Sequence, residues 1–146
     1  LSTRTHLDLF NVPKVYNVMD ELTEEKNAII DKEKLVEINP ELILLDLSGK
    51  ELLDEDMQAD PNFYKSLDAF KNKKAYYIMP YFTYGMNFDT ALLDMYYMGS
   101  LAHPDKFSDV DIAAKAAEIY TVFVGKDVYN DLLGTYPESF KESNVE

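Results

Sequence analysis

The sequence predicts an α/β fold with a small, mostly parallel sheet. One continuous apolar run, residues 42–45, lies between Pro40 and Gly49 and is typical of a strand buried on both faces. A second apolar run covers residues 75–79, and helical patterns connect the two runs. Strand, helical connection and strand form a βαβ unit, so we expect the two strands to be parallel with a right-handed crossover.

The elements before the first of these strands are weaker. Residues 14–19 predict a short strand or an extended segment, and residues 20–30 predict an acidic loop or a frayed helical turn. Asp31 is an expected N-cap, because a carboxylate before an apolar helical pattern can accept hydrogen bonds from free N–H groups. The short helix that follows should stop at residues 39–40, Asn-Pro.

Between the two strands, residues 50–58 and 61–70 predict helices, with Asp60 as a cap and Pro61 at the first helical position. After the second strand we expect a helix from about residue 89, capped by Asp89, to residue 102. Its apolar spacing predicts one buried face, formed by Leu92, Met95, Tyr96 and Gly99.

Two further helical segments complete the pattern. Residues 112–124 predict a helix capped by Asp109 or Asp111 and ended by Gly125. Its expected apolar stripe is Ile112, Ala116, Ile119, Tyr120 and Phe123. A last helical piece over residues 127–133 should end at Gly134, and residues 135–146 are expected to be a mobile tail.

The predicted strands are few. Two good strands and one doubtful strand fall short of the roughly five or six of a usual sheet. Either the sheet is very small, or further strands lie upstream of Leu1, and we favour the second interpretation. The absence of an initial methionine fits the same expectation, namely a mature form or an excised piece of a longer chain.

Composition excludes several functions. The chain has 146 residues, the size of one domain, and a net charge of −13 from 27 acidic and 14 basic residues. This charge argues against binding to nucleic acids or anionic lipids. No cysteine is present, which excludes disulfides, thiolate metal sites and thiol nucleophiles. No apolar run has the roughly 18 residues of a membrane span.

Catalytic and metal-site motifs are also absent. The sequence contains no phosphate-binding glycine loop, no H-E-x-x-H and no G-x-S-x-G. His103 lies before Pro104 at an expected helix end, where a structural role is favoured. The acidic residues of "DLSGKELLDEDMQAD" resemble a calcium loop only in composition. A paired-carboxylate hydrolase is a disfavoured alternative, since any acidic chain offers such pairs. We therefore expect no catalytic residue, no metal site and no cofactor.

The most unusual segment is "AYYIMPYFTYGMNFDT", residues 75–90. Pro80 should end the strand because it has no N–H to donate. The following loop then lies at the carboxyl end of a strand, where open α/β sheets bind ligands. Aromatic rings with polar tips suit a bulky ligand or a chelate. The candidate ligand-binding residues are Tyr81, Thr83, Tyr84, Met86 and Asn87. The alternative is that these rings, above all Phe82 and Phe88, only cover the end of the sheet.

Three segments of the chain resemble, in order, the substrate-binding proteins of iron–siderophore, haem and cobalamin ABC importers. "DKEKLVEINPELILLDLSG" resembles their helix, Asn/Asp-Pro and strand signature. "YKSLDAFKNKKAYYIMPY" resembles their short helix and following strand, and "DTALLDMYYMGSLAHPDKFSDVDIAAKAAEIYTVFVG" resembles their closing pair of helices. The resemblance covers about residues 15–134, and it looks most like iron(III) ABC transporter binding proteins.

This resemblance implies a three-layer αβα lobe, one of two in a class III binding protein. Residues 1–134 would be the C-terminal lobe, with the N-terminal lobe and the linking helix absent. The implied function is non-enzymatic: capture of a ferric chelate and its delivery to an ABC permease by a monomer. The implied ligand contacts are the 81–87 loop and the polar stretch that contains Arg4 and His6. For His6, the residues around it favour the alternative of a surface loop. The implied location is the periplasm, or the outer face of the membrane as a lipoprotein.

Three other functions remain open at this level. The same fold binds haem or cobalamin in related importers. A stand-alone acidic interaction domain would need a complete small sheet within residues 1–146. An enzyme lobe of the nitrogenase-like type is disfavoured, because its clusters require cysteine thiolates.

Overall fold

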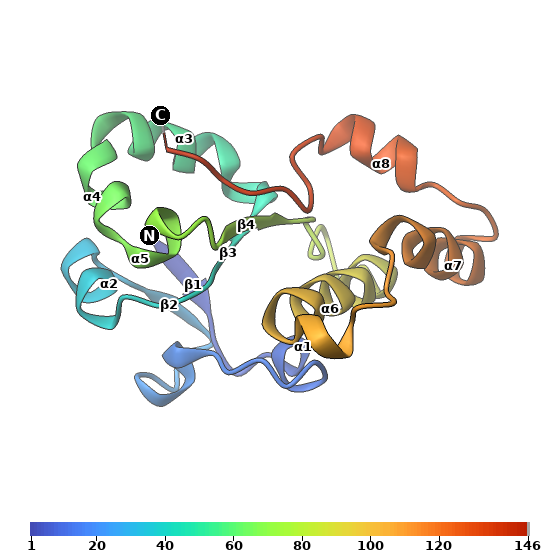
Figure 1. Cartoon of the computed structure of the whole chain (residues 1–146), viewed down its shortest axis with the longest axis horizontal. Coiled ribbons are helices and arrows are strands. Elements are labelled where there is room, and N and C mark those ends of the chain that lie inside the picture. Colours follow the sequence, from blue (N-terminus) through green and yellow to red (C-terminus); the bar gives the residue numbers. More distant parts are fainter. Residues whose placement is uncertain (146) are drawn as a thin grey trace. The chain divides into compact units, whose positions relative to one another are not determined.

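The computed structural model describes residues 1–145 and divides them into two compact units. Unit 1 consists of Leu1–Leu7, Asn17–Ile78 and residues 140–145. Unit 2 consists of Asp8–Tyr16 and Met79–Ser139. Each unit is described by itself below, with the labels of Figure 1.

Unit 1 contains the predicted pair of parallel strands. β3 (Ile43–Asp46) and β4 (Ala75–Ile78) lie side by side in parallel, with Ile43 opposite Ala75 and Asp46 opposite Ile78 (Figure 1). β4 is mostly buried, whereas all four residues of β3 are only half-buried. The parallel pairing predicted from the βαβ pattern is therefore confirmed, but β3 is more exposed than its unbroken apolar run predicts.

A C-terminal segment adds a third member to this sheet. The N–H of Phe140 donates to the carbonyl of Tyr77 over 2.9 Å, and the N–H of Ser143 donates to the carbonyl of Ala75 over 2.8 Å. Tyr76 and Glu142 form an antiparallel bridge. Residues 140–143, which lie within the segment expected to be a mobile tail, therefore pair with the free edge of β4.

A second, antiparallel pair of strands was missed by the sequence analysis. β1 (Ser2–Arg4) pairs with β2 (Asn27–Ile29), and Thr3 lies opposite Ala28. Residues 18–21, expected to be extended or loop, form a 3-10 helix (Val18–Glu21). Strands of three residues carry too short an alternation to be recognised.

Two helices of unit 1 begin at predicted caps, whereas the helix predicted over residues 61–70 is divided at Leu67 into two. α2 (Lys32–Ile38) begins after Asp31, whose carboxylate accepts a hydrogen bond from the N–H of Lys34, and it ends at Asn39 in the left-handed conformation. The carboxylate of Asp60 likewise accepts from the N–H of Phe63. The remaining helices are a 3-10 turn (Leu47–Gly49), α3 (Lys50–Ala59), α4 (Pro61–Ser66) and α5 (Asp68–Lys71).

Unit 2 is helical. It contains α1 (Asp8–Asn11), α6 (Phe88–Ala102), a 3-10 turn (Pro104–Lys106), α7 (Ile112–Val124) and α8 (Tyr129–Thr135). α6 packs against both α1 and α7. Asp111 caps α7, and Gly125 ends it with φ of 82°, as predicted. Of the predicted stripe of α7, Ala116, Ile119 and Tyr120 are buried, but Phe123 is 55% exposed.

The predicted buried face of α6 is wrong. Of Leu92, Met95, Tyr96 and Gly99, only Gly99 is buried. The buried residues are Thr90, Ala91, Leu93, Asp94, Tyr97, Met98 and Gly99. Asn87, not Asp89, is the N-cap residue. Apolar residues occur on nearly every side of this helix, so their spacing does not define one face, and the buried face includes a carboxylate.

These elements confirm the predicted α/β class with a small parallel sheet. Within residues 1–145, no helix combines the length and the apolar character that crossing a membrane requires.

Candidate ligand-binding site

The loop that follows β4 has a buried base. Met79, Pro80 and Tyr81 are all buried, and Met79 is only 1% exposed. The N–H of Met79 donates to Oδ1 of Asp94 on α6 over 3.2 Å. The chain therefore leaves the strand through a packed segment, and its course up to Tyr81 is set by neighbouring side chains.

The tip of the loop is a tight reversal that exposes its side chains. Phe82 and Met86 form an antiparallel bridge, and the N–H of Asn87 donates to the carbonyl of Tyr81 over 2.8 Å. Tyr84 has φ of 57°, in the left-handed region, and Gly85 next to it has φ of 156°. The exposed apolar side chains are Phe82, Tyr84, Met86 and Phe88. Thr83 is exposed as well, and Asn87 is half-buried.

The five loop residues predicted to bind a ligand are therefore divided between the buried base and the exposed tip. Tyr81 lies at the base and is 4% exposed, whereas Tyr84 is fully exposed. Thr83, Met86 and Asn87 accompany Tyr84 around the reversal. A phenol at an exposed tip can stack on a ligand or offer its oxygen to it, but a buried phenol contributes mainly packing.

A group of polar side chains lies inside unit 2 around Met79. Tyr120 on α7 donates its O–H to the sulfur of Met79 over 3.8 Å, and its hydroxyl lies 3.3 Å from Oγ1 of Thr90. Burial raises the pKa of Tyr120 to about 12. Tyr120 is therefore a neutral phenol at physiological pH, and it acts as a hydrogen-bonding group rather than as a charge.

Arg4 and His6, the other two predicted ligand residues, belong to unit 1. Arg4 ends β1, and its carbonyl accepts a hydrogen bond from Nδ2 of Asn17 over 3.0 Å. The N–H of His6 donates to Oδ1 of Asp20 over 2.7 Å. Its Nε2 donates to the carbonyl of Thr23 over 2.9 Å, since a carbonyl can only accept. The ring of His6 thus ties two segments of unit 1 together.

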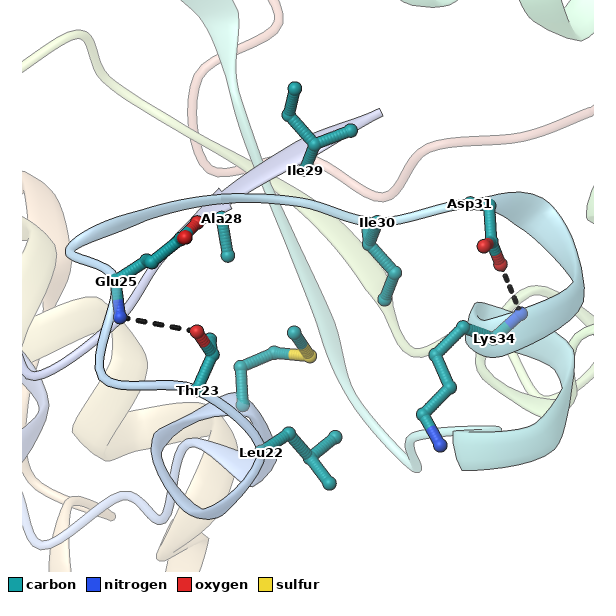
Figure 2. Close-up of a pocket in the computed structure, with 9 residues that line it drawn as sticks. Leu22, Thr23, Glu25, Ala28, Ile29, Ile30, Asp31 and Lys34 are labelled. Carbon is teal, nitrogen blue, oxygen red and sulfur yellow. Dashed lines mark hydrogen bonds between the residues drawn. The ribbon is translucent and has the colours of Figure 1, made fainter.

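Unit 1 contains a pocket of about 200 Å³, which none of the predicted ligand-binding residues lines (Figure 2). Its lining residues are Met19, Leu22, Thr23, Glu25, Ala28, Ile29, Ile30, Asp31 and Lys34. Ala28 and Ile30 point toward its interior, and Ile29 points to the opposite side, as alternation along a strand requires. Its volume is below the roughly 300–1,000 Å³ of most ligand pockets. The pocket is the opening of a small apolar cluster formed around Met19, Ala28 and Ile30.

Charged side chains in unit 1 form a network among helices. Lys32 Nζ lies 3.0 Å from Asp56 and 3.4 Å from Asp60. The hydroxyl of Tyr64 donates to Asp56, and this hydrogen bond together with Lys32 holds the pKa of Asp56 below its usual value. Burial, with Asp56 as its neighbour, raises the pKa of Tyr64. Across residues 1–145, no three His, Asp or Glu side chains gather closely enough to hold a metal ion.

The sequence analysis did not identify Thr90 and Asp94 as buried. The expected buried face of α6 did not include them, but both are buried. Their spacing of four residues, which puts both on one helical face directly after an aromatic loop, is the signal that could have identified them.

Comparison with solved structures identifies the fold. MolA, the molybdate periplasmic binding protein of a Haemophilus influenzae ABC transporter, is 21% identical and matches with a TM-score of 0.68 over 87% of this chain and 40% of its own. CeuE of Helicobacter pylori with Ni(II) bound is 25% identical and matches with a TM-score of 0.63 over 92% of this chain and 44% of its own. A Ni-His complex of CeuE is 27% identical and has a TM-score of 0.62 at the same coverage.

No protein-family model matches the sequence, and no curated protein matches it. The chain spans 40% to 44% of the length of the binding proteins it resembles. These similar structures are transport binding proteins rather than enzymes, in agreement with the prediction of a non-enzymatic chain. The chain therefore has the fold of a lobe of a periplasmic binding protein of ABC importers.

Proposed function

We propose that this chain is the C-terminal lobe of the substrate-binding component of an ABC importer, and that its cargo is a ferric chelate. The observation that carries the proposal is the exposed aromatic loop directly after β4, in a chain with the fold of a binding-protein lobe. The proposed parent is an exported, monomeric protein, held in the periplasm or as a lipoprotein, that delivers its cargo to a membrane permease.

Chelate binding at the tip is supported by the chemistry of its side chains. Tyr84 and Phe82 offer flat apolar faces to the organic part of a chelate, and the hydroxyl of Tyr84 can hydrogen-bond to its oxygen atoms or ligate iron. Thr83 lies between these two residues in the chain, Met86 follows them, and Asn87 is the N-cap residue of α6. In this proposal Tyr81 supports the loop from below rather than contacting the ligand.

Arg4 is proposed to pair with carboxylates of the chelate, because its guanidinium can donate two parallel hydrogen bonds to a carboxylate. His6 is the weaker candidate, since its Nε2 already donates to Thr23. Haem and cobalamin are the alternative cargoes for the same loop, and both also present large flat surfaces.

The test is an NMR titration of the ¹⁵N-labelled chain with ferric catecholate, ferric hydroxamate, ferric citrate, haem, cobalamin, molybdate and Ni(II)-histidine. NMR detects binding at millimolar ligand, which suits a single lobe. We expect one ferric chelate to broaden the amide signals of residues 82–88, while the diamagnetic gallium analogue shifts the same signals without broadening them. Tyr84→Ala should weaken this binding about tenfold, as the loss of one good contact does.

The matched control is Tyr16→Ala, which removes an exposed tyrosine that lies outside the loop. It should leave chelate binding unchanged. If no chelate perturbs residues 82–88, or if the perturbed residues lie only elsewhere, the assignment of this loop as the binding site is wrong. A response to molybdate or to Ni(II)-histidine alone would replace the ferric chelate with that cargo.

A further inference from the structure

The backbone N–H of Met79 has an unusual partner. The ladder between β3 and β4 ends with Asp46 opposite Ile78, so Met79 is the first residue beyond it. The next residue, Pro80, has no N–H. The N–H of Met79 is therefore the last donor before the loop, and it is directed to Oδ1 of Asp94 at 3.2 Å, in the interior of unit 2.

Asp94 is fully buried, with 0% exposure. A carboxylate in the interior is costly unless hydrogen bonds stabilise it, so a buried carboxylate on α6 needs a specific reason. A leucine, methionine or alanine side chain at position 94, like those at the buried neighbouring positions of α6, would be buried at a lower free-energy cost. What Asp94 provides, and an apolar residue does not, is an acceptor at the point where the strand becomes the loop.

One hydroxyl group reaches the side chain of Met79, and a second hydroxyl contacts the first. Tyr120, 1% exposed on α7, donates to the sulfur of Met79, and it contacts the hydroxyl of Thr90 one turn before Asp94. Met79 is thus held at its backbone from α6 and at its side chain from α7. All four residues lie in unit 2, and each is buried.

We propose that Asp94, together with Thr90 and Tyr120, forms a positioning cluster that sets the direction of the 80–88 loop and presents its exposed tip in one conformation. This inference rests on the proposed function, because it assigns to these buried residues the preorganisation of the chelate-binding tip. The contact between Asn87 N–H and Tyr81 carbonyl connects the far side of the loop to the same base. A loop held in its bound conformation loses less entropy when a ligand binds.

The test compares hydrogen exchange of peptides covering residues 80–88 in the full chain and three variants. Asp94→Leu removes the acceptor but keeps an apolar side chain, and we expect exchange of the loop amides to rise about tenfold, as the loss of a buried hydrogen bond predicts. Asp94→Asn retains an acceptor oxygen and should restore the wild-type rate. Leu93→Ala is the control, because it damages the same helix at a buried apolar position and leaves the carboxylate of Asp94 in place.

The control separates positioning from general stability. The inference is overturned if Asp94→Leu raises exchange evenly along the chain, as Leu93→Ala should, or if Asp94→Asn behaves like Asp94→Leu. Should Asp94→Leu fail to fold, Tyr120→Phe removes only one hydroxyl and should still raise exchange in residues 80–88 selectively. An unchanged rate in Tyr120→Phe would then overturn the proposal.

The exchange readout needs no ligand, so it tests the cluster even if every chelate on the NMR panel fails. If a chelate does bind, Asp94→Leu should weaken that binding by a factor similar to the increase in loop exchange, while Asp94→Asn should bind like the wild type. Equal affinity in all three proteins, combined with selective loop exchange, would show a rigid loop that takes no part in binding.

Discussion

The loop tip over residues 82–88 and the segment around His6 were both predicted to bind a ligand, but their side chains are used differently. At the tip, Tyr84 is fully exposed, and the reversal is held by backbone hydrogen bonds. At His6, both the backbone N–H and the ring are occupied by hydrogen bonds within unit 1. A side chain that binds a ligand should be exposed, on a backbone that other hydrogen bonds hold in place. Tyr84 meets this condition better than His6, whose ring is already hydrogen-bonded to Thr23.

The largest test of this difference compares two tyrosines of the same loop. Tyr81→Ala should lower the free energy of unfolding by about 3–5 kcal/mol, because a large buried ring is lost. Tyr84→Ala should change it by less than about 0.5 kcal/mol, as surface substitutions usually do. Urea denaturation measures both values. Similar losses for the two variants would show that the tip is packed in solution, and the comparison would then fail.

A smaller effect is expected from the C-terminal segment, which, like His6, forms hydrogen bonds within unit 1. Deletion of residues 140–146 removes three backbone hydrogen bonds to β4 and the contact between Ser143 Oγ and the Tyr77 hydroxyl. At about 0.5–1.5 kcal/mol for each of the three backbone bonds, the loss from these bonds should be about 1.5–4.5 kcal/mol. Deletion of residues 144–146 alone is the control and should cost little. Equal stability of the two truncated proteins would support the mobile tail predicted from sequence.

The His6 contact itself should be worth less. His6→Ala removes the hydrogen bond from Nε2 to Thr23 and should lower the free energy of unfolding by about 1 kcal/mol. His6→Gln keeps a side-chain N–H and should recover part of this loss. The measurement is again urea denaturation. If His6→Ala were as stable as the wild type yet bound chelate less well, His6 would have to be assigned to the ligand-binding site after all.

The smallest expected effect concerns charge. The Tyr64 hydroxyl, and then Lys32, hold the pKa of Asp56 below its usual value. A lowered pKa in the folded state stabilises the protein above the unfolded value of about 3.9, and this contribution is lost as the pH falls through the folded value. The stability gap between wild type and Asp56→Asn should therefore be present at neutral pH and should close in acid. A gap that stays constant down to strongly acidic pH would show that Asp56 contributes through packing alone.

Several local features could be predicted from the sequence because neighbouring residues decide them. The caps at Asp31, Asp60 and Asp111 and the stop at Gly125 depend on side chains within a few positions of a helix end. The parallel strands followed from two apolar runs and the helices between them. The exposed aromatic loop followed from Pro80, which has no N–H for the strand ladder.

The features that could not be predicted depend on residues far apart in the chain. Residues 140–143 read as a polar tail, yet they pair with β4 more than 60 residues away. β1 and β2 are each three residues long and are defined only by their pairing. In α6, the near-uniform apolar pattern left the buried face undetermined, and contacts with Met79 and α7 decided that Thr90 and Asp94 lie inside.

By itself, then, the sequence determined the α/β class, the helix ends at Asp31, Asp60, Asp111 and Gly125, and the aromatic loop, since these depend on local hydrogen bonding and periodicity. Only the tertiary structure decided which face of α6 is buried, what covers the edge of β4, and which of the candidate ligand residues already have partners. These depend on which distant polar groups meet, because a buried donor or acceptor takes its partner from wherever the fold brings one within reach.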